Sequence, residues 1–118
     1  MAEQATRLKI NDFDGMKIVE FSDRKILDEL CIHEIQEELS RVVDDSPGVK
    51  LVLSFKNVEH LSSAALGMLI TLRNKVDEGG GRLRLSDINP QIFEVFKITR
   101  LNKVFDIYPS IDKAREGF

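Results

Sequence analysis

The sequence predicts a small α/β domain, with a mixed β-sheet and helices packed against it. Short apolar segments with the composition of strands alternate along the chain with longer segments. In the longer segments apolar residues recur every three to four positions, as on one face of a helix. The chain has 118 residues, and two domains of half that length would each be too small to bury a good core. We therefore expect one domain over residues 1–118, with the element order ββαβαβαβα.

The first two strands are predicted to form a hairpin. Residues 7–10 (RLKI) and 16–22 (MKIVEFS) have the composition of strands, and Asp14-Gly15 between them has the residue types of a tight turn. Residues 16–22 carry apolar side chains on both faces of the expected strand. This pattern favours a position inside the sheet rather than at its edge.

A helix is expected next, over residues 30–44, followed by a central strand at 49–55. Asp28 precedes this helix and could cap its first turn. Residues 49–55 (VKLVLSF) form the most apolar strand of the chain, as expected of a strand that is covered on both faces. The predicted inward stripe of the helix consists of Ile32, Ile35, Leu39 and Val42.

The second helix is expected over residues 63–78, and three glycines at 79–81 should end it because their backbone adopts the conformation that a helix end needs. A strand follows at 82–86 (RLRLS). Connections of these lengths between strands imply parallel pairing with right-handed crossovers. The predicted inward stripe of the second helix consists of Ala65, Leu69, Leu72 and Val76.

The last third of the chain completes the predicted order. Asn89-Pro90 is a strong helix start, because asparagine caps a first turn and proline suits its first position. Residues 103–107 are predicted as a short strand, and residues 109–116 as a terminal helix with Ile111 and Ala114 inward.

Composition excludes several classes of function. The chain is 42% hydrophobic and 31% charged, and its net charge of −3 argues against binding to nucleic acid or to an anionic membrane. No apolar run is long enough for a membrane span, and the N-terminus lacks the apolar core of a signal peptide.

A single cysteine, Cys31, excludes an internal disulfide framework, suits a reducing cytoplasm and favours a packing role. His33 and His60 lack companions at metal-ligand spacing, so we predict no metal and no cofactor.

The adjacent serines Ser62 and Ser63 stand where the strand LVLSF gives way to the second helix. Three roles compete for them: a helix cap, a catalytic nucleophile and a phosphate acceptor. Capping is favoured by chemistry alone and does not exclude a second role. Catalysis has little support, because the G-x-S-x-G elbow is absent and a nucleophilic serine needs an oriented base. We therefore expect that the protein is not an enzyme.

A phosphate acceptor has a clear physical basis at this position. A hydroxyl at a helix N-terminus is reachable by a kinase, and a phosphate added there meets free N–H groups and the positive end of the helix dipole. It adds about −1.5 to −2 charges. A partner surface that fits the unmodified serine would then face an uncompensated dianion, so binding and phosphorylation would exclude each other.

Several segments, in order and spacing, resemble the STAS domain, the fold of bacterial anti-sigma factor antagonists. They are GMKIVEFS and ILDEL near the start, LVLSF and NVEHLSSAALGMLI around the serines, RLRLS, and ITRLNKVFDIYPSIDKA at the end. The resemblance implies a non-enzymatic switch that binds an anti-sigma factor, itself a serine kinase of the GHKL type. Binding would free a sigma factor, phosphorylation by the kinase would end binding, and a PP2C-type phosphatase would reset the cycle.

The serine motif departs from the family pattern, which usually reads Asp-Ser-Ser-Gly-Leu-Gly with phosphate on the second serine. Alignment on Leu66-Gly67 places Ser62 on the aspartate, Ser63 on the first serine and Ala64 on the acceptor. Either Ser63, or else Ser62, accepts phosphate in its place, or the protein binds its partner without a phosphate switch. We favour Ser63 as the acceptor, with Ser62 as the cap.

The resemblance also places a partner surface at this end of the fold. The link that contains Asp28 would lie beside the serine loop, so the predicted contact residues are Asp28, Ser62, Ser63 and Leu66. A second hypothesis is a STAS-like module that senses a small ligand or nucleotide at the same helix N-terminus, without regulation by phosphorylation.

Overall fold

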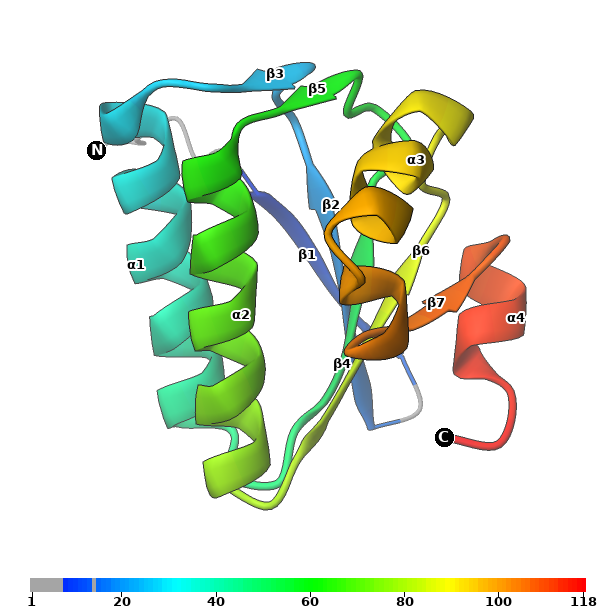
Figure 1. Cartoon of the computed structure of the whole chain (residues 1–118). Helices are drawn as coiled ribbons and strands as arrows, with labels where there is room; N and C mark the ends of the chain where they lie inside the picture. Colours follow the sequence, from blue (N-terminus) through cyan, green and yellow to red (C-terminus); the bar gives the residue numbers. More distant parts are fainter. Residues whose placement is uncertain (1–7, 14) are drawn as a thin grey trace.

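The structure, a computed structural model, describes residues 8–13 and 15–118 (Figure 1). Its main sheet has five strands in the order β1-β2-β4-β6-β7. Strands β2, β4, β6 and β7 run parallel, and β1 pairs antiparallel with β2. The predicted mixed sheet and the internal position of β2 are thus confirmed. The strands of this main sheet are β1 (Leu8–Phe13), β2 (Met16–Phe21), β4 (Lys50–Ser54), β6 (Arg82–Ser86) and β7 (Asp106–Tyr108).

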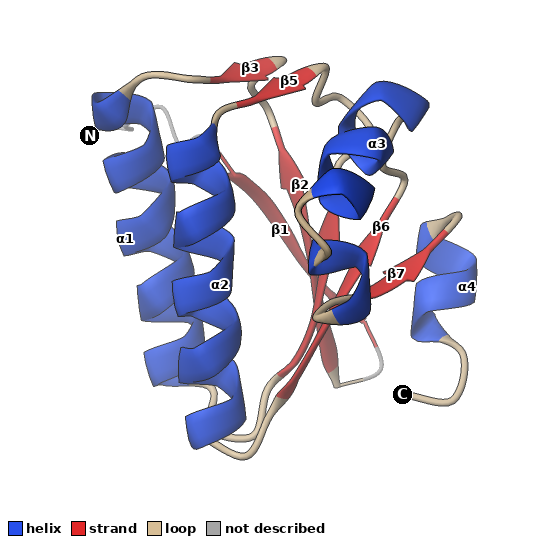
Figure 2. Cartoon of the chain, in the orientation of Figure 1, coloured by secondary structure: helices blue, strands red, loops and turns tan. Residues whose placement is uncertain are grey.

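Helices cover both faces of this sheet (Figure 2). Three of them, α1 (Glu29–Asp45), α2 (Ser63–Glu78) and α3 (Pro90–Ile98), share a core with one face, and the short α4 (Ile111–Arg115) packs on the other. Asp14, one of the two residues predicted to form the turn between β1 and β2, lies outside the described residues. Within the described part of the chain, none of the helices combines the length and the apolar character that a membrane crossing requires.

The inward stripes predicted from the sequence match the buried faces of the helices. All four predicted residues of α2 are buried, and in α1 the fourth position of the stripe is Val43, while Val42 is half-buried. These stripes pack on strand residues that are fully buried, such as Leu51, Leu53 and Leu85. A continuous core between the helices and the sheet therefore fixes where α2 begins relative to the strands.

A Schellman motif ends α2 in the glycine run. The N–H of Gly81 donates to Val76 O at 2.9 Å, and the N–H of Gly80 donates to Asp77 O at 3.0 Å. Gly80 has a φ of 80°, in the left-handed region that favours glycine. The chain then turns tightly against the start of β4, and a Cβ at Gly81 would lie 2.4 Å from Val49 O.

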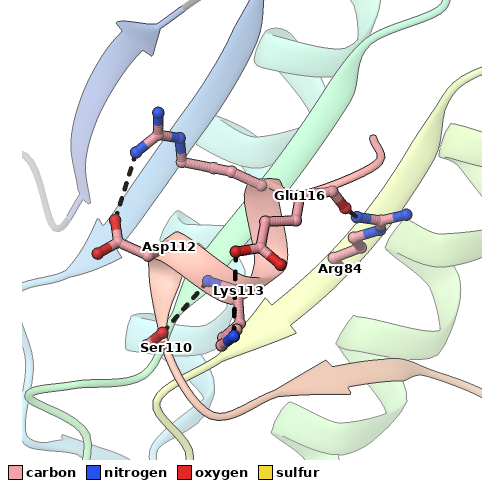
Figure 3. A network of polar contacts seen from close by, with 6 residues as sticks. Arg84, Ser110, Asp112, Lys113 and Glu116 are labelled. Atoms are coloured by element: carbon pink, nitrogen blue, oxygen red, sulfur yellow. Dashed lines mark hydrogen bonds and ion pairs between the residues drawn. The ribbon is translucent and has the colours of Figure 1, made fainter.

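On the opposite face of the sheet, α4 is held by the buried side chain of Arg84 (Figure 3). Its guanidinium donates to Ala114 O at 2.9 Å and to Glu116 O at 2.7 Å, carbonyl groups at the end of the helix. The rings of Tyr108 and Phe118 lie 5.0 and 4.3 Å from the guanidinium carbon. The helix is shorter than the predicted span of 109–116, because Ser110 caps it (Ser110 Oγ accepts from Lys113 N at 3.2 Å).

The predicted strand over residues 103–107 is wrong in its bounds. The first residue of that span, Lys103, ends a 3₁₀ turn, η1 (Leu101–Lys103). The N–H of Phe105 donates to Leu101 O at 3.0 Å, so these residues make a helical turn that buries both side chains. Strand geometry starts only at Asp106, where pairing with Arg84 of β6 becomes available.

Two short strands were missed by the sequence analysis, β3 (Lys25–Ile26) and β5 (His60–Leu61). They pair in parallel as a separate two-stranded sheet. This β3–β5 ribbon lies across the end of the molecule at which α1, α2 and α3 begin (Figure 1). Strands of two residues leave too little periodicity to recognise, and only their pairing defines them.

Candidate functional site

The start of α2 divides its two serines between different environments. Ser62 is the N-cap residue, and its Oγ accepts a hydrogen bond from Ala65 N at 3.2 Å. Ser63 is the first residue of the helix and is exposed to solvent, as is Ala64. The predicted helix cap is confirmed, and the residue that performs it is Ser62.

The backbone around Ser63 provides a positive electrostatic environment. The first intrahelical bond runs from Leu66 N to Ser62 O at 3.2 Å, so the N–H groups of Ser63 and Ala64 precede the helical ladder and point out of its start. The first turn of α2 contains no acidic residue that would neutralise the dipole. A negative charge on Ser63 would therefore be stabilised by the fold itself.

The β3–β5 ribbon places the link before α1 beside the serines. The N–H groups of Glu59 and His60 donate to Arg24 O at 2.7 and 3.1 Å, and the N–H of Ser62 donates to Ile26 O at 3.1 Å. Two residues after Ile26, Asp28 caps α1, since its Oδ1 accepts from the backbone N of the third helical residue at 2.8 Å. The predicted proximity of the Asp28 link and the serine loop is therefore present in the structure.

Leu66 differs from the other predicted contact residues because it is only 6% exposed. Its accessible part lines a groove of about 130 Å³ between the ribbon and α3. The remaining lining residues come from the ribbon and from α3, and the sequence analysis did not assign any of them to this site. They are Glu59, His60, Leu61, Gln91, Ile92 and Val95.

Exposed apolar side chains flank the serine end on two sides. Leu27 and Leu30 are 48% and 63% exposed beside the α1 cap, and Val95 is 39% exposed on α3. Leu27 precedes the cap of α1 and Leu30 lies off the buried stripe of this helix, and these positions were the signal in the sequence that could have identified them. An apolar patch with polar residues at its rim is the composition expected of a surface that binds another protein, and these side chains supply the apolar part.

Neither a metal-binding cluster nor an exposed thiol is found among the described residues of the site. Among the described residues, no three His, Cys, Asp or Glu side chains cluster in a way that could hold a metal ion. Cys31 is buried, and its Sγ donates to Asp23 Oδ2 at 3.7 Å. The predicted packing role of this cysteine is consistent with its position in the core.

The family model of the STAS domain matches residues 9–114, almost the whole chain. The chain belongs to the STAS domain family. This STAS protein is 22% identical over 102 residues to a protein of Paenibacillus polymyxa named anti-sigma F factor antagonist, and the alignment covers 86% of each chain.

Solved structures of STAS proteins have the same fold. An anti-sigma-factor antagonist (STAS) domain protein from Planctomyces limnophilus superposes with a TM-score of 0.82 at 16% identity, covering 94% of this chain and 96% of the other. The Bacillus cell fate determinant SpoIIAA, in its phosphorylated form, superposes with a TM-score of 0.68 at 13% identity, covering 92% and 99%. At these identities the likeness concerns the fold alone.

Proposed function

We propose that this STAS protein is an anti-sigma factor antagonist, a non-enzymatic regulator that binds an anti-sigma factor. Family membership and the name of the Paenibacillus polymyxa relative support the general role. The partner proposed here is a serine kinase of the GHKL type, which would release its sigma factor when the antagonist binds.

One observation carries the proposal of a phosphate switch: Ser63 is exposed at the first position of α2 while Ser62 performs the cap. A kinase can reach the Ser63 hydroxyl without breaking the hydrogen bond that starts the helix. We assign Ser63 as the acceptor because it is the exposed hydroxyl nearest to Ala64, the family's usual acceptor position. The dipole and free N–H groups of α2 would then stabilise the phosphate.

Binding and phosphorylation exclude each other through charge. The proposed partner surface includes Asp28, Ser62, Ser63 and the accessible edge of Leu66, flanked by the exposed leucines of the α1 start. A dianion at Ser63 would be buried in that interface, and like-charge or unpaired contacts there cost several kcal/mol. Each 1.4 kcal/mol weakens binding about tenfold. A PP2C-type phosphatase would restore the binding form.

The experiment is phosphorylation by a cognate GHKL kinase with ATP, followed by mass spectrometric mapping. The matched variants are Ser63→Ala, which removes the proposed acceptor, and Ser62→Asp, which removes the neighbouring hydroxyl but keeps a cap acceptor. We expect one phosphate on Ser63 in the wild type and in Ser62→Asp, and none in Ser63→Ala. Phosphate on Ser62 alone, or none at all, would refute the assignment.

Binding of the unmodified protein to the same kinase tests the antagonist role separately. We expect a saturable complex by calorimetry with the wild type and with Ser63→Ala. If no GHKL-type anti-sigma factor encoded in the same genome binds the wild type, the antagonist role is wrong.

The second hypothesis, a sensor of a small ligand or nucleotide, has weaker support from the site. The groove beside Leu66 has a volume of about 130 Å³, while pockets for small molecules and cofactors usually measure about 300–1,000 Å³. A nucleotide that raises the thermal midpoint progressively, with the logarithm of its concentration once that exceeds Kd, would favour this hypothesis.

A further inference from the structure

The side chain of Asn89 connects two loops that lie far apart in the sequence. Its Oδ1 accepts a hydrogen bond from Ile92 N at 2.8 Å and so caps α3. Its Nδ2 donates to Val58 O at 3.1 Å, across 31 residues of sequence. The same amide therefore joins the first turn of α3 to the segment that leads from β4 into the serine loop.

Val58 lies at the point where this segment enters the candidate site. Its side chain is 1% exposed, and the backbone that follows it donates from Glu59 and His60 to Arg24 O, within the β3–β5 ribbon. Ser62 follows β5 and is the N-cap residue of α2. A hydrogen bond to Val58 O thus fixes the beginning of a short segment whose other end carries both serines.

Capping alone does not require asparagine at position 89. A serine or aspartate oxygen would accept from Ile92 N equally well, because an N-cap needs only an acceptor. Capping makes no use of the Nδ2 donor of Asn89, and this donor instead makes the hydrogen bond to Val58 O. The residue type therefore indicates a second role besides the cap.

We infer that Asn89 is a positioning residue, which holds residues 58–62 in the shape that presents Ser62 and Ser63 to a partner. A second tie, from Asn57 Nδ2 to Phe21 O, is longer at 3.4 Å and holds the other side of the segment. The effect of Asn89 on partner binding rests on the proposed function; its effect on the segment does not.

The test is Asn89→Asp, which keeps the cap acceptor, removes the donor and sets a carboxylate oxygen against Val58 O. We expect amide hydrogen exchange of His60 and Ser62 to rise about fivefold, the population change that the loss of one ordinary hydrogen bond implies. Exchange within α3, for example at Phe96, should stay unchanged because the cap is intact. Affinity for the anti-sigma factor should fall by at most the same factor, because it follows the fraction of molecules in which the segment keeps its shape.

Asn89→Ser is the neutral companion variant, because it keeps a capping oxygen, adds no charge and cannot reach Val58 with a donor. It should reproduce the faster exchange, and it also decides the question if Asn89→Asp fails to fold. Ser110→Ala, which removes the α4 cap on the far face, is the control for general destabilisation and should leave exchange at His60 and Ser62 unchanged.

Two results would overturn the inference. One is unchanged exchange at His60 and Ser62 in Asn89→Ser. The other is an equal increase in the segment, in α3 and in the sheet, which would mean that Asn89 only contributes to global stability. If the wild type binds no anti-sigma factor, the proposed function fails, while the exchange data still decide the role of Asn89.

Discussion

The Oγ of Ser62 lies 3.2 Å from the backbone N of Ala65 and accepts its hydrogen bond, while the adjacent Ser63 is exposed at the first position of the helix. Two neighbouring hydroxyls thus serve different purposes. One stabilises the start of α2, and the other can change its charge without breaking that start. This division allows the structural and regulatory roles of the pair to be measured separately.

Replacing Ser62 with alanine should destabilise the protein by about 1 kcal/mol, because the N–H of Ala65 loses its partner at the helix start. Ser62→Asp should keep most of the wild-type stability, since a carboxylate caps as well as a hydroxyl. Urea unfolding of both variants measures the difference. Equal stability of Ser62→Ala and the wild type would show that the cap contributes nothing.

Replacing Ser63 with aspartate should leave the free energy of unfolding unchanged or raise it by about 0.3–1 kcal/mol, because an acid in the first turn of a helix interacts favourably with the dipole. The same variant should bind the anti-sigma factor at least about tenfold more weakly, through one unit of charge buried in the interface. Calorimetric titration alongside Ser63→Ala, expected to bind like the wild type, measures this effect. Wild-type affinity of Ser63→Asp would contradict the charge mechanism.

Replacing Gly81 with alanine should destabilise the protein by about 1–3 kcal/mol, because the new Cβ would lie 2.4 Å from the backbone oxygen of Val49 and the chain must shift. Gly67 offers the matched control within α2, since a Cβ there meets nothing within 4 Å. Gly67→Ala should stabilise by about 0.5–1 kcal/mol through helix propensity. Thermal unfolding of the two variants should therefore shift in opposite directions.

Replacing Arg84 with methionine should destabilise the protein by about 2–3 kcal/mol, because the last carbonyl groups of α4 lose a charged donor in a buried position. The exposed Lys113 of α4 is the control, and Lys113→Met should change stability by less than about 0.5 kcal/mol. Limited proteolysis should cleave the chain near α4 faster in Arg84→Met alone. Unchanged proteolysis would mean that α4 stays docked without the arginine.

The C-terminal third shows why sequence patterns misplace some elements. Lys103 and Val104 look like the start of a strand, but both are exposed, and the residues that the core requires are Leu101 and Phe105. Their spacing of four residues suits a helical turn. Only the position of β6, which offers its edge at Arg84, decides where strand pairing begins.

Some features of the candidate site could likewise be predicted from the sequence, and others depend on the tertiary structure. Local chemistry was sufficient to predict the caps at Asp28 and Asn89 and the cap within the serine pair, because capping depends on a few consecutive residues. The contribution of α3 to the groove beside Leu66 depends on contacts across about 25 residues of sequence, which no local pattern records.

The sequence by itself determined the order of the main strands and helices, their buried stripes and the start of α2 at Ser63. These features follow from periodicity and from the hydrogen-bonding needs of helix ends, which act over one or two turns of chain. Only the tertiary structure decided that the β3–β5 ribbon exists and that Asn89 reaches Val58. Each of these depends on which backbone groups the folded core brings within hydrogen-bond distance, and that distance is set by packing rather than by neighbours in the chain.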